Sequence, residues 1–282
     1  MPDNNLDPTN VQDGLKSLGP IENVNASTWT LIKNKYRSKS IAVLIIAVFV
    51  AIFLNPFFVI VIGFIYYIYI RNKVQAEFMR QFATAQKFEY AENMPLDAVK
   101  GRLFKLGHSQ TIENVVSGNY QNRPLKIFNY QYTVGGGKNQ TTHQFTVLEI
   151  SFSETIFPHI LLQSETMMRF DATSWGEKNQ DTEINLEEQF RKNYHLFATD
   201  GYEIEVLQIF TGEMLEFLGQ KGSNFSIEFA ENRMYIYDDL FISKITELRG
   251  IFGLAEKILD LSGPLLDRLH DDFAALDPYY KK

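Results

Sequence analysis

One short stretch brings together residue types that could move protons. Within eleven residues the chain carries His195, Asp200, Glu203 and Glu205. A carboxylate close to a histidine can take part in general acid and base catalysis. Glu203 and Glu205 are two residues apart, so on a strand both side chains would point to one face. The alternative interpretation, which we favour, is that these residues lie on an exposed strand face beside the turn at 199–201 and take no part in catalysis. His195, Asp200 and Glu203 are therefore weak catalytic candidates.

No motif specifies a metal, a cofactor or a covalent mechanism. None of the five histidines has a second histidine four residues away or a glutamate two residues away, the spacings typical of metal sites. The chain has no cysteine, no Gly-x-Ser-x-Gly elbow and no dinucleotide fingerprint. The segment 135–138 (GGGK) lacks the full spacing of a phosphate loop and is interpreted as a hairpin turn. We expect no metal and no cofactor, and we favour a protein that is not an enzyme.

The elements that would position these residues follow a long apolar run. Residues 41–70 carry no charge and are interrupted by Asn55-Pro56. Eighteen or more such residues are typical of a transmembrane helix. One straight helix of this length would measure about 45 Å, against a hydrocarbon core of about 30 Å. Pro56 also removes a backbone donor. The sequence predicts two membrane-spanning helices, about 38–54 and 56–72; the alternative is a single kinked span.

Basic residues flank this run on both sides, and tyrosines lie near its end. The positive-inside rule places basic flanks in the cytoplasm, and only a hairpin keeps both of them there. Tyrosines are typical of the membrane interface. We expect a multi-pass protein of the cell membrane with two spans and both termini cytoplasmic. The residues concerned are Lys33, Lys35, Arg37 and Lys39 before the run, Tyr66, Tyr67 and Tyr69 near its end, and Arg71, Lys73 and Arg80 after it.

The charge balance narrows the possible partners. The 282-residue chain has a formal charge of −7. From residue 71 onward it carries 22 Lys and Arg against 30 Asp and Glu, a charge of −8. Such an acidic body is a poor nucleic-acid binder. We expect a lipid bilayer and a protein at the membrane as partners, and no nucleic acid; the sequence leaves the oligomeric state open.

The second half of the chain alternates between strand and helix patterns. Residues 112–118, 122–134 and 142–152 alternate apolar and polar residues, which predicts an antiparallel meander. Residues 224–237 predict a hairpin that turns at Glu231-Asn232. Pro158 favours an edge position for the strand 156–163.

Three further features concern helices and boundaries. Residues 203–210 fit either a strand or a helix, and the helix that follows Asp238 and Asp239 is expected to end at Gly263-Pro264. The predicted fold is α+β: an N-terminal transmembrane helical hairpin, then a soluble domain of antiparallel sheet with packed helices. The predicted divisions are a disordered polar tail (1–26), the transmembrane hairpin (27–74) and a cytoplasmic α+β body (75–282).

Several of these segments resemble a family of bacterial membrane-anchored domains of unknown function. Residues 113–150 are similar to its strand block, in which a Gly-x-Tyr-x-x-x-Pro turn precedes an aromatic strand. Residues 190–218 resemble its second half, and 225–237 its closing hairpin. The resemblance implies a membrane hairpin and an α+β cytoplasmic body, and no known reaction.

These observations favour a membrane-anchored binding or scaffolding protein. One alternative is an enzyme whose site is spread over the α+β body. The other is a protein that shapes membranes with its hairpin.

Overall fold

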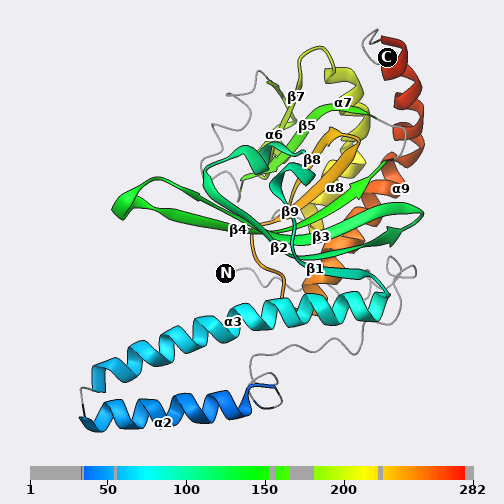
Figure 1. Cartoon of the computed structure of the whole chain (residues 1–282). Coiled ribbons are helices and arrows are strands. Elements are labelled where there is room, and N and C mark those ends of the chain that lie inside the picture. Colours follow the sequence, from blue (N-terminus) through cyan, green and yellow to red (C-terminus); the bar gives the residue numbers. More distant parts are fainter. Residues whose placement is uncertain are drawn as a thin grey trace.

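A twisted antiparallel sheet occupies the centre of the computed structural model (Figure 1). The structure describes residues 33, 35–53, 56–152, 156–165, 181–221 and 225–276. Of these, residues 50–53, 56–58, 71–72, 220–221 and 263–276 are described by their backbone alone. The predicted disordered tail and Asn55 lie outside the described residues.

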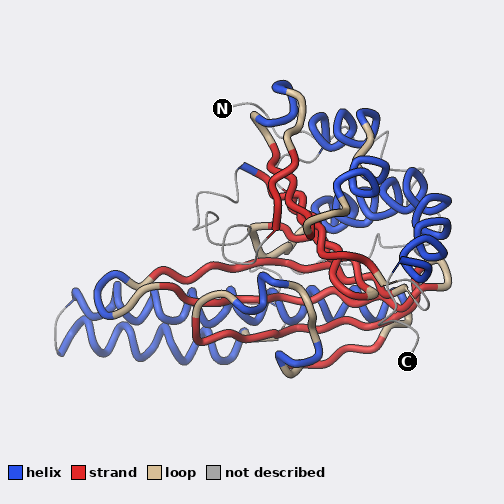
Figure 2. The backbone as a smooth tube through the Cα atoms, turned by 90° about the horizontal axis from the view of Figure 1, so that it is seen from above, coloured by secondary structure: helices blue, strands red, loops and turns tan. Residues whose placement is uncertain are grey.

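The described strands form a single nine-stranded sheet in the order β1-β2-β3-β4-β9-β8-β5-β7-β6. Every neighbouring pair is antiparallel. Figure 2 shows from above that the two ends of the sheet run in different directions, as the natural twist of β-strands requires. The strands are β1 (Glu89–Asn93), β2 (His108–Tyr120), β3 (Arg123–Val134), β4 (Thr141–Ser151), β5 (Phe157–Ser164), β6 (Asp181–Ile184), β7 (Tyr194–Thr199), β8 (Phe225–Glu231) and β9 (Arg233–Asp238).

The predicted α+β character and the meander are confirmed. Strands β2, β3 and β4 are consecutive neighbours, and β8 and β9 form the predicted hairpin. Glu231 closes this hairpin with a φ of 54°, a left-handed conformation typical of tight turns.

The sheet separates two apolar cores. Along β3, Leu125 and Ile127 point to one face, and Phe128 and Tyr130 point to the other. The first face is covered by helices, and the second by short 3-10 turns. The helices that contribute to the first core are α3 (Pro56–Gln86), α6 (Glu188–Arg191), α7 (Glu203–Ile209), α8 (Gly212–Lys221) and α9 (Ile245–Leu276), and the 3-10 turns of the second are η1 (Leu96–Ala98) and η2 (Arg102–Lys105). Helix α2 (Arg37–Phe53) packs on α3, and the 3-10 turn η3 (Gly137–Asn139) buries no residue.

The strand that contains Pro158 is not at an edge, contrary to the prediction. β5 lies between β8 and β7. The register between β5 and β8 shifts between Phe157 and Ile160, so Pro158 falls where the ladder is already irregular. A bulge of this kind accommodates a residue without a backbone donor.

Helix α9 continues through Gly263-Pro264, where the sequence predicted an end. Proline removes one backbone hydrogen bond and kinks a helix, but it need not end a long one.

The predicted membrane-spanning hairpin is wrong. Helices α2 and α3 contact each other, but no helix among the described residues is long and apolar enough to cross a membrane. The 17 residues of α2 measure about 25 Å, and the uncharged part of α3 ends before Arg71 and measures about 22 Å, against about 30 Å of hydrocarbon. The predicted multi-pass topology, its location in the cell membrane and the cytoplasmic placement of both termini are corrected with it.

Candidate functional site

The most concentrated chemistry of the described residues lies on the sheet face opposite the helices. Five strands and turns contribute to one buried charged cluster. The sequence allows this because β5, β8 and β9 each carry a polar side chain at an inward position among apolar neighbours. We define the buried cluster as Arg102 of η2, His159 of β5, Asp181 of β6, Glu228 of β8 and Tyr237 of β9.

His159 lies between two carboxylates. Its Nδ1 is 2.9 Å from Asp181 Oδ2, and its Nε2 is 2.7 Å from Glu228 Oε1. Both ring nitrogens can donate only in the imidazolium form. Burial opposes that charge, but the hydrogen bonds to Asp181 and Glu228 outweigh it and raise the pKa of His159.

Glu228 is fully buried and has a donor at each oxygen. Besides His159, its Oε1 accepts the Arg102 backbone N–H at 2.7 Å, and its Oε2 accepts the Tyr237 hydroxyl at 2.5 Å. Burial would raise the pKa of Glu228, yet these donors hold it below its usual value. Burial and the adjacent Glu228 carboxylate raise the pKa of Tyr237 well above its ordinary value, so the phenol stays protonated.

The turn that contains Gly101 lies very close to the side chains of the buried cluster. A Cβ added at Gly101 would lie 2.5 Å from the Tyr237 hydroxyl and 2.7 Å from Glu228 Oε2. Only glycine therefore lets the backbone of the next residue reach Glu228.

Arg233 and Tyr235 of β9 also hold this segment, and Arg233 pairs with a third buried carboxylate, Glu149. Arg233 Nη1 is 2.5 Å from the Ala98 carbonyl and 3.4 Å from Glu149. The Tyr235 hydroxyl accepts the Lys100 backbone N–H at 2.9 Å. Residues 98–102 are thus fixed to the sheet by polar contacts at several points.

The buried cluster is balanced in charge and internally bonded. Arg102 also pairs with Asp181, so two cations face two carboxylates. The His159 side chain is only 9% exposed, which leaves little access for a substrate. Among the residues that the structure describes, no group of His, Cys, Asp or Glu could hold a metal ion. The buried cluster therefore fixes the η1–η2 segment to the sheet.

The sequence candidates for catalysis do not form a site. His195 lies in β7, with Nδ1 2.8 Å from Glu183 and Nε2 3.0 Å from Glu165. Asp200 follows β7 and accepts the Thr182 hydroxyl at 3.3 Å. Five residue steps of extended chain separate it from His195, or about 16 Å.

Glu203 and Glu205 are not on a strand, as the acid–base interpretation assumed. Both lie in the first turn of α7, where residues two apart point in different directions. Glu203 accepts the Gly201 backbone N–H at 3.3 Å.

The buried cluster was missed because histidines were judged by metal spacing alone. A usable signal was present: His159 and Glu228 are single charged or titratable residues inside the apolar strands FPHILLQ and FSIEF. Such a residue must be paired if the strand is buried.

The second unusual feature is an exposed apolar pair of helices, which we call the arm and define as residues 37–53 and 56–70. In Figure 1 it projects beneath the sheet, away from α9. Both helices expose many large apolar side chains to solvent. Soluble monomeric proteins rarely expose so many of them together. The exposed side chains are Ile41, Leu44, Ile45, Ile46, Val48, Phe49, Ile60, Val61, Phe64, Ile65, Tyr67, Ile68 and Tyr69.

The base of the arm, next to the sheet, is polar and aromatic. Ser40 Oγ and the Tyr66 hydroxyl are 2.7 Å apart and join the two helices. The rings of Tyr36 and Tyr69 meet edge to face at 6.2 Å. Lys35 Nζ pairs with Glu77 at 2.7 Å. The arm is therefore fixed at its base by direct contacts between its two helices.

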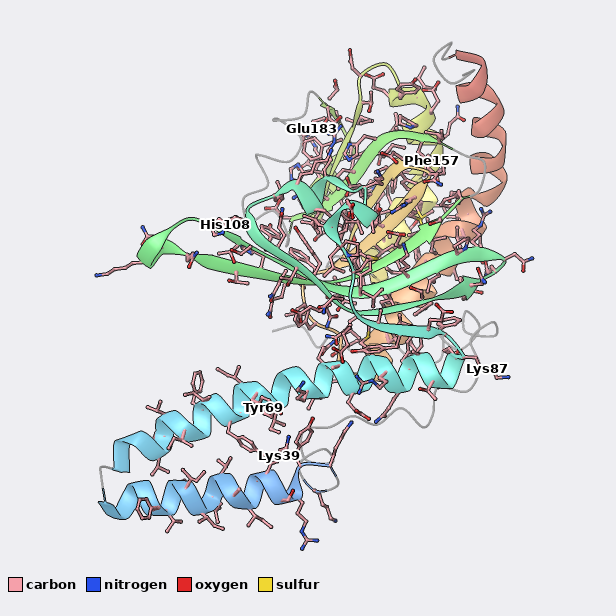
Figure 3. All side chains as sticks on the ribbon, in the orientation of Figure 1. Lys39, Tyr69, Lys87, His108, Phe157 and Glu183 are labelled. Atoms are coloured by element: carbon pink, nitrogen blue, oxygen red, sulfur yellow. The ribbon has the colours of Figure 1, made fainter. Side chains whose placement is uncertain are left out.

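The residues predicted to contact a membrane lie within this arm or close to its ends. Tyr66, Tyr67 and Tyr69 are in α3, and Figure 3 shows Lys39 and Tyr69 on facing helices. Arg37 begins α2 and Lys73 lies one turn beyond Tyr69. Pro56 begins α3, as its tolerance of a first helical position allows, and Arg71 is described by its backbone alone.

Comparison with known proteins gives a fold but no family. No protein-family profile and no curated protein matches the sequence. Among solved structures, the chain is similar to the crystal structure of the mycobacterial trehalose monomycolate transport factor A, TtfA, with a TM-score of 0.50 and 12% identity. The match covers 67% of this chain and 94% of that chain. At this identity the likeness shows the fold alone, so the family resemblance noted in the sequence stays a prediction.

Proposed function

We propose that this chain is a binding or scaffolding protein that attaches to a lipid surface from one side through the arm. The exposed apolar surface of the arm carries the proposal. Apolar patches of this size on a folded protein mark interaction sites with proteins or lipids. Attachment by the arm would hold the acidic sheet body beside the surface, where a tethered domain meets partners at raised effective concentration.

The distribution of the apolar side chains favours lipid over a protein partner. Leu44, Ile45 and Ile46 follow one another in α2 and are 66%, 62% and 54% exposed. Successive residues of a helix lie about 100° apart, so these three face different directions. A protein partner covers one stripe of a helix, whereas acyl chains can surround it.

The lengths of the helices set the depth of this attachment. The apolar lengths of about 25 Å and 22 Å fall short of a hydrocarbon core of about 30 Å. The proposed attachment is therefore a partial insertion that leaves the far side of the lipid layer untouched. It involves no crossing.

An enzyme with a dispersed site has less support. The titratable groups of the buried cluster are bonded to one another, and His195 lies apart from Asp200 and Glu203. Binding requires only the surface that the arm exposes.

A matched pair of double variants tests the attachment. Leu44→Asn with Ile60→Asn alters the arm, and Leu240→Asn with Ile204→Asn alters the body. The side chains are 66% and 71% exposed in the arm, and 68% and 72% exposed in the body, so the two variants lose equivalent apolar groups. Binding of the full chain to phosphatidylcholine vesicles is measured by flotation.

We expect the arm variant to bind at least ~100-fold more weakly and the body variant to bind as the parent does. Each buried Leu or Ile is worth about 1.5–3 kcal/mol, and about 1.4 kcal/mol is tenfold in affinity. The proposal fails if the parent protein does not float, or if both variants lose binding equally. If the parent forms a defined dimer that the arm variant dissociates, and does not float, a second copy covers the arm instead.

A further inference from the structure

Five basic residues belong to the segments of the chain at the base of the arm. We call them the basic collar: Lys33, Lys35, Arg37, Lys39 and Lys73, all of them exposed. Four precede or begin α2, and the fifth comes from α3, so the collar is formed only when the two helices pack together.

Aromatic contacts build this collar from both helices. Lys39 Nζ lies 5.5 Å from the ring centroid of Tyr36, and Lys73 Nζ lies 5.9 Å from that of Tyr69. The two rings contact each other at 6.2 Å. Such cation–π contacts hold an ammonium near a ring without neutralising it. Lys39 and Lys73 therefore each lie, as charged groups, beside one ring of this tyrosine pair.

The charges of the basic collar are largely uncompensated. Lys35 pairs with Glu77, but no described carboxylate forms an ion pair with Arg37, Lys39 or Lys73. This contrasts with a chain whose formal charge is −7. A local excess of positive charge at the base of an apolar arm is complementary to a lipid layer with an apolar interior and anionic headgroups.

We infer that the basic collar binds the phosphate groups of anionic phospholipids while the arm lies among their acyl chains. The inference rests on the proposed function and adds the class of lipid. Basic side chains near an anionic surface each strengthen binding about fivefold, and the effect decays within a Debye length of about 8–10 Å. The acidic body opposes the same surface, so the attraction is confined to the basic collar.

The test compares neutral vesicles of phosphatidylcholine with vesicles that also contain phosphatidylglycerol. The collar variant carries Arg37→Gln, Lys39→Gln and Lys73→Gln. The control variant carries Arg191→Gln, Lys105→Gln and Lys138→Gln, which removes the same number and kinds of exposed charge from the body. Flotation of the full chains is measured at low and high salt.

We expect the parent and the control variant to bind anionic vesicles about 100-fold more tightly than neutral ones at low salt. The collar variant keeps its binding to neutral vesicles and loses most of this preference, because only Lys33 and the Glu77-paired Lys35 remain. High salt removes the preference of the parent and the control variant. Equal binding of the parent to both vesicles, or a collar variant that keeps the preference, overturns the inference and leaves the proposed function intact. A parent that binds neither vesicle overturns both.

Discussion

At the scale of single residues, His159 shows how a buried charge can serve structure. Its ring bridges Asp181 and Glu228, while the Arg102 guanidinium and the Tyr237 hydroxyl satisfy the same carboxylates. Removing one member of such a network leaves another charge buried without a partner, which costs several kcal/mol. The network therefore stabilises one arrangement of the η1–η2 segment, and its charged groups are bonded to one another.

This geometry predicts a stability that depends on pH. Because the pKa of His159 is raised in the folded state, its contribution is fully present below about pH 6.5, the unfolded value, and is lost as pH rises through the folded value. We expect His159→Gln to lower the free energy of unfolding by about 3 kcal/mol at pH 6 and by less at pH 9. Urea denaturation at both pH values measures this difference.

His195 supplies the matched control. It also lies between two carboxylates, but Glu165 and Glu183 are about half exposed, so solvent screens the interaction. His195→Gln should change stability little at either pH. Equal losses for the two variants, or a His159→Gln variant that loses as much at pH 9 as at pH 6, would contradict the assignment.

The sequence showed which residues could titrate but not which would meet. His159, Asp181 and Glu228 are brought together by the strand order β8-β5-β7-β6, and that order depends on pairings between distant segments. His195 and Asp200 are close in the sequence, yet an extended strand separates them. Proximity along a chain is a poor guide to proximity in a sheet.

At the scale of elements, the two halves of the continuous helix α3 have different surroundings. Its first half belongs to the arm, where Phe64 is 63% exposed. Its second half packs against the body, where the ring of Phe82 is fully buried, 6.1 Å from Phe88 and 5.8 Å from Phe252. The same residue type is therefore exposed to solvent in one half and part of the core in the other.

Phenylalanine truncation separates these two contributions. Phe82→Ala should lower the free energy of unfolding by about 3–5 kcal/mol, because it leaves a cavity in the core. Phe64→Ala should leave lipid-free stability within about 0.5 kcal/mol, because little packing is lost. Thermal unfolding without vesicles measures both; comparable losses would mean that the arm is buried in the folded chain.

The strands of this chain are predictable from its sequence, whereas the relation of its apolar helices to a membrane is not. Period-two alternation located β2, β3, β4 and the β8–β9 hairpin, because each strand buries side chains against a core. The break at Asn55-Pro56 separated α2 from α3 near the expected place. The predicted crossing is wrong because each helix, at about 25 Å and about 22 Å, is shorter than the roughly 30 Å of hydrocarbon that it would have to span.

At the scale of the whole molecule, the arm and the sheet body should respond differently to lipid. We expect vesicles to slow amide hydrogen exchange in residues 37–53 and 56–70, since insertion removes these amides from water. Exchange in β3 and β9, at the centre of the sheet, should not change. Mass spectrometry with and without vesicles measures both regions.

The variant with Leu44→Asn and Ile60→Asn provides the control for this measurement. Its arm should exchange at the same rate with and without vesicles. Slower exchange across the sheet of the parent would instead indicate that the body itself contacts lipid.

The continuity of α3 has a mechanical consequence. The helix runs for 31 residues, about 46 Å, and Gln75 Nε2 joins its middle to the Ile242 carbonyl at 2.5 Å. A flexible linker would let a tethered domain sample every orientation, but a packed helix resists bending. Any torque applied to the arm is therefore transmitted to the sheet without a hinge. Under the proposed attachment, a partner that approaches the body would meet it at one fixed angle to the lipid surface.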